Sequence, residues 1–303
     1  MAKEATTIEA AGREVRLSSP NKPFFADTDP PITKLELAEY YVAVADAAVI
    51  HLRERPTTLK RFVDGAAGEF FFQKRVPKGA PEWLESATVH FPSGRSAREL
   101  CANDAAHLVW AVNLGVIDFN PWPCRRADLD CPDELRVDLD PTPEASWDDV
   151  RKVALCARDV LVDHDLVGFP KTSGSDGIHV LVPIERRHTY DDTREFSAIV
   201  AGTLARTHRG LVTTEWTKSK RQGVLIDSNQ NGEGKTIASV YSVRPHPGAP
   251  VSTPLRWDEV KAGLDPRSFT LETTLARIER EGDLFAGVLT TRQSLGKALR
   301  AIR

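Results

Sequence analysis

The sequence contains little cysteine and carries almost no net charge. Its 303 residues include 4 cysteines, 1 methionine and a formal net charge of −3. The cysteines form no Cys-x-x-Cys pair beside paired histidines, which argues against a structural zinc site and for free thiols. Because positive charge is not in excess, any binding of nucleic acid must rely on local basic clusters.

Long apolar runs are also missing, and the first residues do not resemble a secretory signal peptide. No stretch of the chain is apolar over the roughly 20 residues that a bilayer-spanning helix requires. Residues 1–11 are polar and of mixed charge, unlike a secretory signal peptide. We therefore expect a cytoplasmic protein without a membrane partner.

The order of the expected elements indicates an α/β chain. Strand-like and helix-like segments alternate, which is typical of a mixed sheet covered by helices. Thr33 and Glu36 have the spacing of a capping box and predict a helix that ends at residues 53–56. Asn103 is expected to cap a second helix that stops at Gly115. No repeat or linker is evident, so we expect one compact domain over residues 1–303.

The ordered core of that domain is expected from about residue 20 to about residue 290, without a ligase or phosphoesterase module. Within it, Glu134–Pro141 has the composition of a short strand. Successive strand side chains point to opposite faces, so Asp138 and Asp140 project from one face. Neighbouring carboxylates repel each other unless a cation lies between them, and oxygen ligands favour Mg²⁺ or Mn²⁺. The alternative is a solvated strand edge that enters a turn at Pro141.

Two later segments contain groups that a metal-dependent, phosphate-binding site needs. Residues 173–179 (Ser-Gly-Ser-Asp-Gly-Ile-His) combine small residues with backbone N–H groups before an apolar strand, which suits an anion such as a triphosphate. A further strand, residues 223–227, ends in a third carboxylate, Asp227. A Gly/Ser turn is also a common connection between two strands, and this is the alternative for residues 173–179.

Basic and aromatic residues indicate where nucleic acid could bind. Lys22 and Lys34 flank the start of the first helix, an arrangement that suits a phosphate, with solvated lysines as the alternative. Phenylalanines 70–72 cannot all share one face of a strand. An exposed ring beside Lys74 would stack on single-stranded bases, whereas a strand buried on both faces is the alternative. Residues 215–221 are basic with one interleaved tryptophan.

The order of these segments resembles the archaeo-eukaryotic primase superfamily, and more narrowly the polymerase domain of bacterial DNA ligase D, used in non-homologous end joining. The resemblance is carried by Phe70–Lys74, Asp133–Pro141, Thr172–Ser175, Ile226–Gly232, Tyr241–Pro245 and Gly248–Pro254. It implies a catalytic sheet like that of an RNA-recognition fold, packed with a second α/β portion in one compact domain. It also implies template-directed nucleotidyl transfer with two divalent metal ions, Mn²⁺ or Mg²⁺.

Matching positions imply roles for individual residues. The expected metal-binding and catalytic carboxylates are Asp138, Asp140 and Asp227. The residues expected at the nucleotide are Ser173, Ser175, His179, Asn120, Lys235 and Arg244. The resemblance places Lys22, Lys34, Phe71 and Phe72 at DNA, and the basic composition of their segments adds Lys74, Lys218, Lys220 and Arg221 as residues expected at DNA.

Two residues depart from the family pattern. Relatives tend to carry Lys or Arg at the position of Asp176, where a carboxylate repels a triphosphate unless it turns outward or a cation such as Lys171 offsets it. Relatives carry a His near the sugar at the position of Asn120. An Asn can still donate a hydrogen bond, but the preference between ribo- and deoxyribonucleotides can change.

The resemblance predicts a polymerase or primase that adds nucleotides to DNA primer ends in end joining or gap filling. Its expected partners are gapped DNA with a 5′-phosphate, NTPs or dNTPs, a separate DNA ligase and an end-binding protein on the bacterial nucleoid. One alternative is a non-catalytic protein that bridges DNA ends and keeps the fold and the phosphate-binding lysines. A metal-dependent nuclease is another, although it leaves the 173–179 turn without a function.

Overall fold

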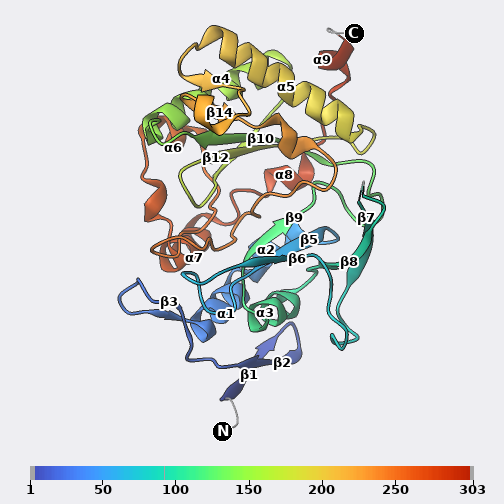
Figure 1. The fold of residues 1–303 in the computed structure, drawn as a ribbon, viewed down its shortest axis with the longest axis vertical. Coiled ribbons are helices and arrows are strands. Elements are labelled where there is room, and N and C mark those ends of the chain that lie inside the picture. Colours follow the sequence, from blue (N-terminus) through green and yellow to red (C-terminus); the bar gives the residue numbers. More distant parts are fainter. Residues whose placement is uncertain (1–3, 92, 301–303) are drawn as a thin grey trace. The chain divides into compact units, whose positions relative to one another are not determined.

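The computed structural model describes residues 4–91 and 93–300, which divide into two compact units (Figure 1). Unit 1 consists of the described residues in the ranges 1–127, 236–252 and 267–283. Unit 2 consists of those in the ranges 128–235, 253–266 and 284–303. Both units contain helices and sheets, so the α/β class expected from the sequence is confirmed.

Unit 1 is organised around strand β5 (Pro56–Arg61). β5 pairs antiparallel with β6 (Phe71–Gln73), with β8 (Ser96–Cys101) and with β9 (Val116–Pro121). Strand β7 (Ser86–His90) extends this sheet by pairing with β8. Because β5 has neighbours on both sides, the residues of β5, β6 and β9 are held in a fixed register. This register determines which polar side chains of the three strands lie opposite each other.

Two hairpins and several helices surround this sheet. The hairpins pair β1 with β2 and β3 with β4. Their bounds, with those of the helices, are β1 (Ala5–Ala10), β2 (Arg13–Ser18), β3 (Pro23–Phe25), β4 (Ile32–Thr33), α1 (Lys34–Ala43), α2 (Ala45–Leu52), α3 (Ala105–Asn113) and α7 (Leu271–Glu281). The short turn η3 (Pro266–Ser268) lies where the chain passes from unit 2 back to unit 1.

Helix capping in unit 1 agrees with the sequence at α1 and differs at α3. The Thr33 hydroxyl accepts from the Glu36 N–H, and the Glu36 carboxylate accepts from the Thr33 N–H, as the capping box predicts. The predicted helix is interrupted at Val44, where α1 ends and α2 begins.

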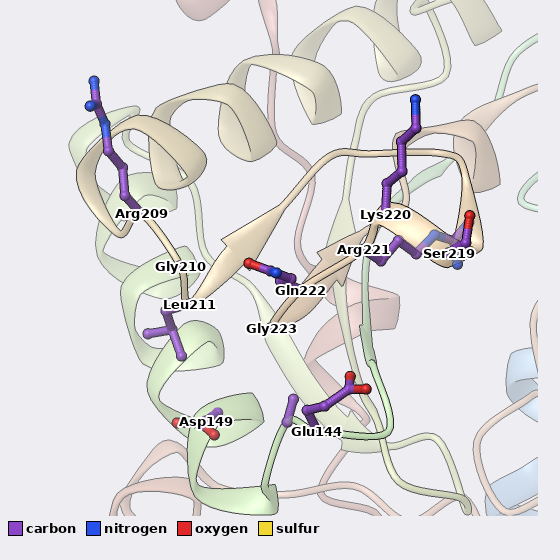
Figure 2. Close-up of a pocket in the computed structure, with 11 residues that line it drawn as sticks. Glu144, Asp149, Arg209, Gly210, Leu211, Ser219, Lys220, Arg221, Gln222 and Gly223 are labelled. Carbon is purple, nitrogen blue, oxygen red and sulfur yellow. The ribbon is translucent and has the colours of Figure 1, made fainter.

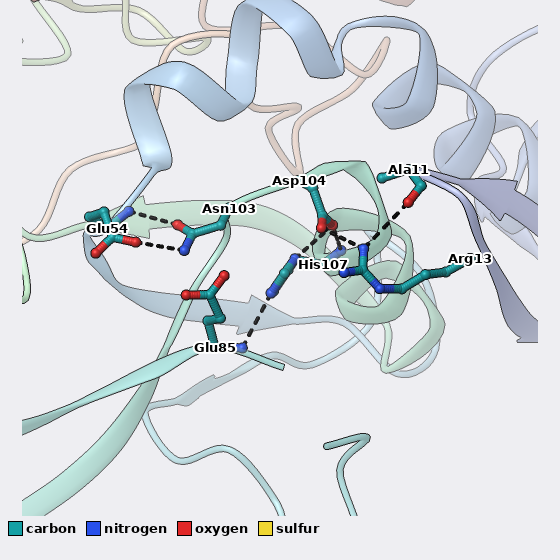
Figure 3. Close-up of polar contacts among 7 residues, drawn as sticks. All are labelled: Ala11, Arg13, Glu54, Glu85, Asn103, Asp104 and His107. Atoms are coloured by element: carbon teal, nitrogen blue, oxygen red, sulfur yellow. Dashed lines mark hydrogen bonds and ion pairs between the residues drawn. The ribbon is translucent and has the colours of Figure 1, made fainter. Parts of the chain in front are cut away.

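The N-cap of α3 is Asp104 rather than the predicted Asn103. Figure 3 shows the reason: the Asn103 amide exchanges two hydrogen bonds with Glu54, through its Oδ1 at 2.8 Å and its Nδ2 at 2.7 Å. Asp104 is then the residue that accepts from His107, and it also pairs with Arg13 at 2.6 Å. A tertiary contact therefore decided which of two adjacent capping residues is used.

Unit 2 contains a second five-stranded sheet, in the order β11-β12-β10-β14-β13. Its central strand β10 (Glu134–Pro141) pairs antiparallel with β12 (Ile178–Pro183) and with β14 (Val224–Ile226). Strand β11 (Phe169–Thr172) pairs antiparallel with β12, and β13 (Val212–Thr213) pairs parallel with β14.

Helices α4 (Trp147–Asp163) and α5 (Tyr190–Thr207) lie over this sheet in Figure 1. Ser146 caps α4 through a reciprocal box with Asp149. The remaining elements of unit 2 are η1 (Lys218–Lys220), η2 (Ser228–Asn231), α6 (Trp257–Ala262), α8 (Gly287–Thr290) and α9 (Gly296–Arg300). Across the described ranges, every helix is too short or too polar to cross a membrane.

Candidate active site

Strand β10 separates apolar from polar side chains by simple alternation. Leu135, Val137 and Leu139 share one face and are fully buried. The opposite face carries Glu134, Arg136, Asp138 and Asp140 in succession. Arg136 pairs with Glu134, with its Nη2 2.6 Å from Glu134 Oε1, so the charges at the start of this face offset each other. The end of the face is acidic: Asp138 is 4% exposed and Asp140 is exposed.

The register of the sheet brings His179 and Asp227 to Asp138. His179 on β12 is the residue directly opposite Asp138. On the other side, Leu139 pairs with Ile226, and the Asp227 N–H donates to the Asp138 carbonyl at 3.1 Å. Asp227 is itself buried. Three segments that are far apart in the sequence therefore meet at one point of the sheet.

The electrostatics of this point are unfavourable without a cation. Burial raises the pKa of Asp138 well above its usual value, and the charges of Asp140 and Asp227 raise it further. The charges of Lys171 and Arg136 oppose this shift. Asp138 Oδ1 is buried and accepts no hydrogen bond, although His179 Nε2 lies 3.3 Å from it.

His179 is buried but lies in a polar setting. Its Nδ1 is 2.8 Å from the ammonium of Lys171, a residue of the neighbouring strand β11. An ammonium group can only donate, so Nδ1 accepts and the proton of the neutral ring is on Nε2, which faces Asp138. Lys171, His179 and Asp138 therefore form a continuous row across three strands.

The acid cluster suits a hard divalent cation in its chemistry. Among residues 4–91 and 93–300, no three His, Cys, Asp or Glu side chains are already arranged to hold a metal ion. The ligand atoms available from Asp138, Asp140 and Asp227 are all carboxylate oxygens, which Mg²⁺ and Mn²⁺ prefer. A buried oxygen without a hydrogen bond costs free energy, and a cation beside Asp138 Oδ1 would offset that cost.

The Ser-Gly-Ser turn lies between β11 and β12. The Ser173 hydroxyl accepts from the N–H groups of Ser175 and Gly177, each at 3.1 Å, so it shapes the turn. A Cβ at Gly177 would lie 2.5 Å from the Leu139 carbonyl oxygen, so only glycine allows the turn to approach β10 this closely. Asp176 is exposed in this turn, and Lys235 is exposed on a later loop.

The other two residues expected at the nucleotide lie in unit 1. Asn120 is buried on β9, and its Nδ2 is 3.4 Å from the Asp118 carbonyl. Arg244 pairs with the Asp118 carboxylate, with Nε 3.2 Å from Oδ2. Lys60 on β5 stands directly opposite Asp118. Sequence reasoning missed Asp118 and Lys60, although the two-residue spacing of Asp118 and Asn120 on a strand would have placed both on one face.

The three consecutive phenylalanines are all exposed, between 47% and 56%. Cations accompany them: Lys60 Nζ is 4.1 Å from the centre of the Phe70 ring, and the Arg61 guanidinium is 4.9 Å from that of Phe71. Lys74 lies over the ring of Phe91 in the same way. Exposed rings beside cations are what stacking on single-stranded nucleic acid requires.

Lys22 and Lys34 differ in exposure. Lys22 is partly exposed, and its Nζ contacts the Val63 carbonyl at 2.7 Å and Asp64 at 3.0 Å. Lys34 is 5% exposed, and its Nζ donates to the carbonyl oxygens of Ser18 at 2.9 Å and Asn113 at 2.8 Å. Backbone carbonyls therefore hold Lys34 in a buried position, whereas Lys22 is partly exposed.

Lys218, Lys220 and Arg221 lie on the loop between β13 and β14. Arg221 donates to the carbonyls of Glu215 and Trp216 and lies over the Trp216 ring. Lys220 and Arg221 line a pocket of about 760 Å³ within unit 2, and in Figure 2 the Lys220 side chain extends outward from the loop. Glu144 and Asp149 also line it, so its charge is mixed.

Comparisons with known proteins agree on one family. Residues 33–285 match the family model described as LigD, primase-polymerase domain. A multifunctional non-homologous end joining protein LigD from Pseudomonas aeruginosa is 33% identical over 299 residues, covering 98% of this chain and 35% of that protein. Its counterpart from Mycolicibacterium smegmatis is 33% identical over 275 residues, covering 90% of this chain and 36% of that protein.

The fold has a similar counterpart among solved structures. The polymerase domain of Mycobacterium tuberculosis ligase D, in complex with DNA, aligns with a TM-score of 0.83 at 31% identity, covering 90% of this chain and 96% of that one. In contrast, the chain spans only 35–36% of the length of the two full-length relatives named above. The similarity therefore concerns one domain of those longer proteins.

Proposed function

Because this chain belongs to the LigD primase-polymerase domain family, we propose that it is a template-directed nucleotidyltransferase that extends DNA primers. Its substrates would be NTPs or dNTPs and short DNA gaps with a 5′-phosphate, in end joining or gap filling. The names of the relatives refer to non-homologous end joining, and that of the structural neighbour to a complex with DNA, which supports this substrate. The matched range, 33–285, includes parts of both units, so we propose one catalytic domain.

The observation that carries the proposal is the position of Asp138. It lies between His179 and Asp227 with a buried oxygen that accepts no hydrogen bond. Asp138, Asp140 and Asp227 would hold two divalent cations. Such ions, Mn²⁺ or Mg²⁺, lower the pKa of a bound hydroxyl and neutralise charge on the transferred phosphate. The raised pKa of Asp138 is the expected property of a carboxylate placed for a cation.

The residues around the acids would position the nucleotide. Ser173, Ser175 and His179 belong to the turn proposed for the triphosphate, and His179 Nε2, 3.3 Å from Asp138 Oδ1, is proposed to donate to an anionic oxygen of the nucleotide. Arg244, Lys235 and Asn120 are proposed to contact the phosphates and sugar. Transfers of phosphoryl groups depend mainly on positioning and charge neutralisation, so these contacts would hold the α-phosphate in line with the primer 3′-hydroxyl.

The DNA would be bound by charge and stacking. The proposed phosphate contacts are Lys22, Lys34, Lys74, Lys218, Lys220 and Arg221, with Phe71 and Phe72 stacking on bases. Phe71 and Phe72 are exposed beside cationic side chains, which supports this use. The proposed partners are a separate DNA ligase and an end-binding protein, on nucleoid DNA in the bacterial cytoplasm.

One assay distinguishes the proposal from its alternatives. A gapped, 5′-phosphorylated duplex with a labelled primer is incubated with Mn²⁺ and either NTPs or dNTPs, beside a sample that contains EDTA. Lengthening of the primer supports a polymerase, and shortening supports a metal-dependent nuclease. A bound but unchanged primer supports an end-bridging protein and refutes the proposal.

A further inference from the structure

The segment 241–244 is held in an unusual backbone conformation by buried side chains. Tyr241 has a φ of 63°, a left-handed value that a tyrosine rarely adopts. Its N–H donates to the Ser252 carbonyl at 2.7 Å, and its own carbonyl accepts from the Tyr40 hydroxyl at 2.9 Å. The Tyr241 hydroxyl donates to Asp283 at 2.6 Å. The start of this segment is therefore fixed on several sides.

The next residues of the segment are fixed as well. The Val243 N–H donates to the Tyr41 hydroxyl at 3.0 Å, and that hydroxyl donates to the Ile117 carbonyl at 2.6 Å. The Arg244 N–H donates to the Pro250 carbonyl at 2.8 Å. The backbone that carries Arg244 is thus set before any ligand binds, and only its long side chain needs further support.

Asp118 supplies that support from strand β9. Its carboxylate is 1% exposed, with Oδ2 3.2 Å from Arg244 Nε and Oδ1 3.3 Å from the Ser242 hydroxyl. The same hydroxyl accepts from the Phe119 N–H at 3.0 Å, which ties segment 241–244 to β9 at two adjacent residues. The contact at Arg244 Nε is an ion pair without the geometry of a hydrogen bond, so Asp118 acts on the guanidinium through its charge.

The Asp118 carboxylate also acts on a second cation, Lys60. Lys60 stands opposite Asp118 on β5, where burial lowers its pKa, Asp118 raises it and Arg244 lowers it. At Lys60, the charge of Asp118 therefore opposes the effect of the Arg244 charge. Resting on the proposed role of Arg244 at the nucleotide, we infer that Asp118 is a positioning residue that holds the Arg244 guanidinium for the triphosphate.

The inference is tested by steady-state kinetics on Asp118→Asn, which removes the charge and keeps the volume. We expect the KM for the nucleotide to rise about tenfold, the loss typical of one charge-assisted contact, while kcat falls less than about threefold. Asp118→Glu retains the charge and is expected to keep the KM closer to wild type. Asp104→Asn is the matched control, because Asp104 also pairs with an arginine of unit 1 and asparagine can still cap α3.

A double-mutant cycle with Arg244→Gln separates the possible results. If Asp118 acts through Arg244, Asp118→Asn changes the nucleotide KM little in the Arg244→Gln background. An additive effect, or an unchanged KM in Asp118→Asn, overturns the inference. An unchanged KM in Arg244→Gln instead overturns the proposed nucleotide role of Arg244. Thermal unfolding and DNA affinity are measured for each variant, and if Asp118→Asn does not fold, the cycle is run with Asp118→Ser, which also removes the charge.

Discussion

The charged residues of β10 in unit 2 and those of β5 in unit 1 lie in different environments. On β10, Asp138 is buried, whereas Asp140 is exposed. The register of three strands places His179 and the buried Asp227 against Asp138. On β5 and β6, cations lie over exposed aromatic rings, with Phe72 56% exposed. Buried like charges store an unfavourable free energy that a bound cation can release. Exposed rings beside partly buried cations cost little free energy without a ligand, and they can stack on the bases of a flexible strand.

The strongest test of this comparison is to replace Asp138, the buried acid of β10. Asp138→Asn and Asp138→Ala are expected to lower primer extension by at least about 10³-fold, because positioned charge is the main source of catalysis here. The same Asp138→Asn change is expected to raise the midpoint of thermal unfolding, because it removes a buried charge whose pKa is raised by burial and by Asp140 and Asp227.

Asp176→Asn is the control for this first prediction, because Asp176 is an acid of the adjacent turn but is exposed. It is expected to retain the extension rate within a few-fold. Added Mn²⁺ should raise the unfolding midpoint of the wild type by mass action and not that of Asp138→Asn. Undiminished extension by Asp138→Ala would remove the candidate site.

Glu99, a buried acid of unit 1, extends the comparison because its effect on stability depends on pH. Burial raises the pKa of Glu99 from its ordinary value of 4.5 to about 7, while Lys74, Thr58 and Trp122 act in the opposite direction. The folded protein therefore binds more protons than the unfolded chain between these values. The free energy of unfolding should fall as pH rises from about 4.5 to about 7, by about 3 kcal/mol.

Glu99→Gln cannot ionise, so it should flatten this part of the pH profile. Urea unfolding of both proteins between pH 4.5 and 8 measures the difference. The Glu99 contribution is fully present at the acidic end of this window and absent at the alkaline end, where Glu99→Gln is expected to be the more stable protein. Parallel profiles for the two proteins would show that Glu99 does not titrate in this range.

The aromatic surface of unit 1 is expected to contribute to DNA binding without contributing to stability. Phe71→Ala and Phe72→Ala should each weaken binding of a gapped duplex by about 1–3 kcal/mol if the ring stacks on a base. Their unfolding midpoints should stay close to wild type, because both rings are about half exposed. Fluorescence anisotropy gives the affinity, with Val162→Ala as a matched exposed apolar control. Equal affinities for all variants would contradict stacking.

The smallest effect is expected at the two lysines. Lys22→Ala should reduce the preference for a phosphorylated over an unphosphorylated gap by about 1 kcal/mol, and the preference should fade as salt rises. Lys34→Ala should mainly destabilise the fold, because the carbonyls of Ser18 and Asn113 lose their buried donor. Gap affinities at two salt concentrations and unfolding midpoints separate these outcomes. An unchanged preference for the phosphorylated gap in both variants would contradict binding of the 5′-phosphate by these lysines.

The predicted family resemblance is confirmed by the family match and the similar domain structure. The capping box at Thr33 could also be predicted, because it depends on two residues three positions apart. The choice of Asp104 over Asn103 as a cap was not, because it depends on the contact of Asn103 with Glu54. The roles of individual site residues stay predictions until the variants above are measured.

Local sequence was sufficient to place Asp138 and Asp140 on one face of a strand, because alternation is a property of the backbone alone. It was also sufficient to pick out Asp227 and His179 as candidates. Only the tertiary structure decided that Asp227 bonds to Asp138, that Lys171 sets the tautomer of His179, that Lys34 is buried, and that Asp118 pairs with Arg244. Each of these depends on the pairing register of strands or on the path of loops far apart in the chain, and no local pattern encodes that register.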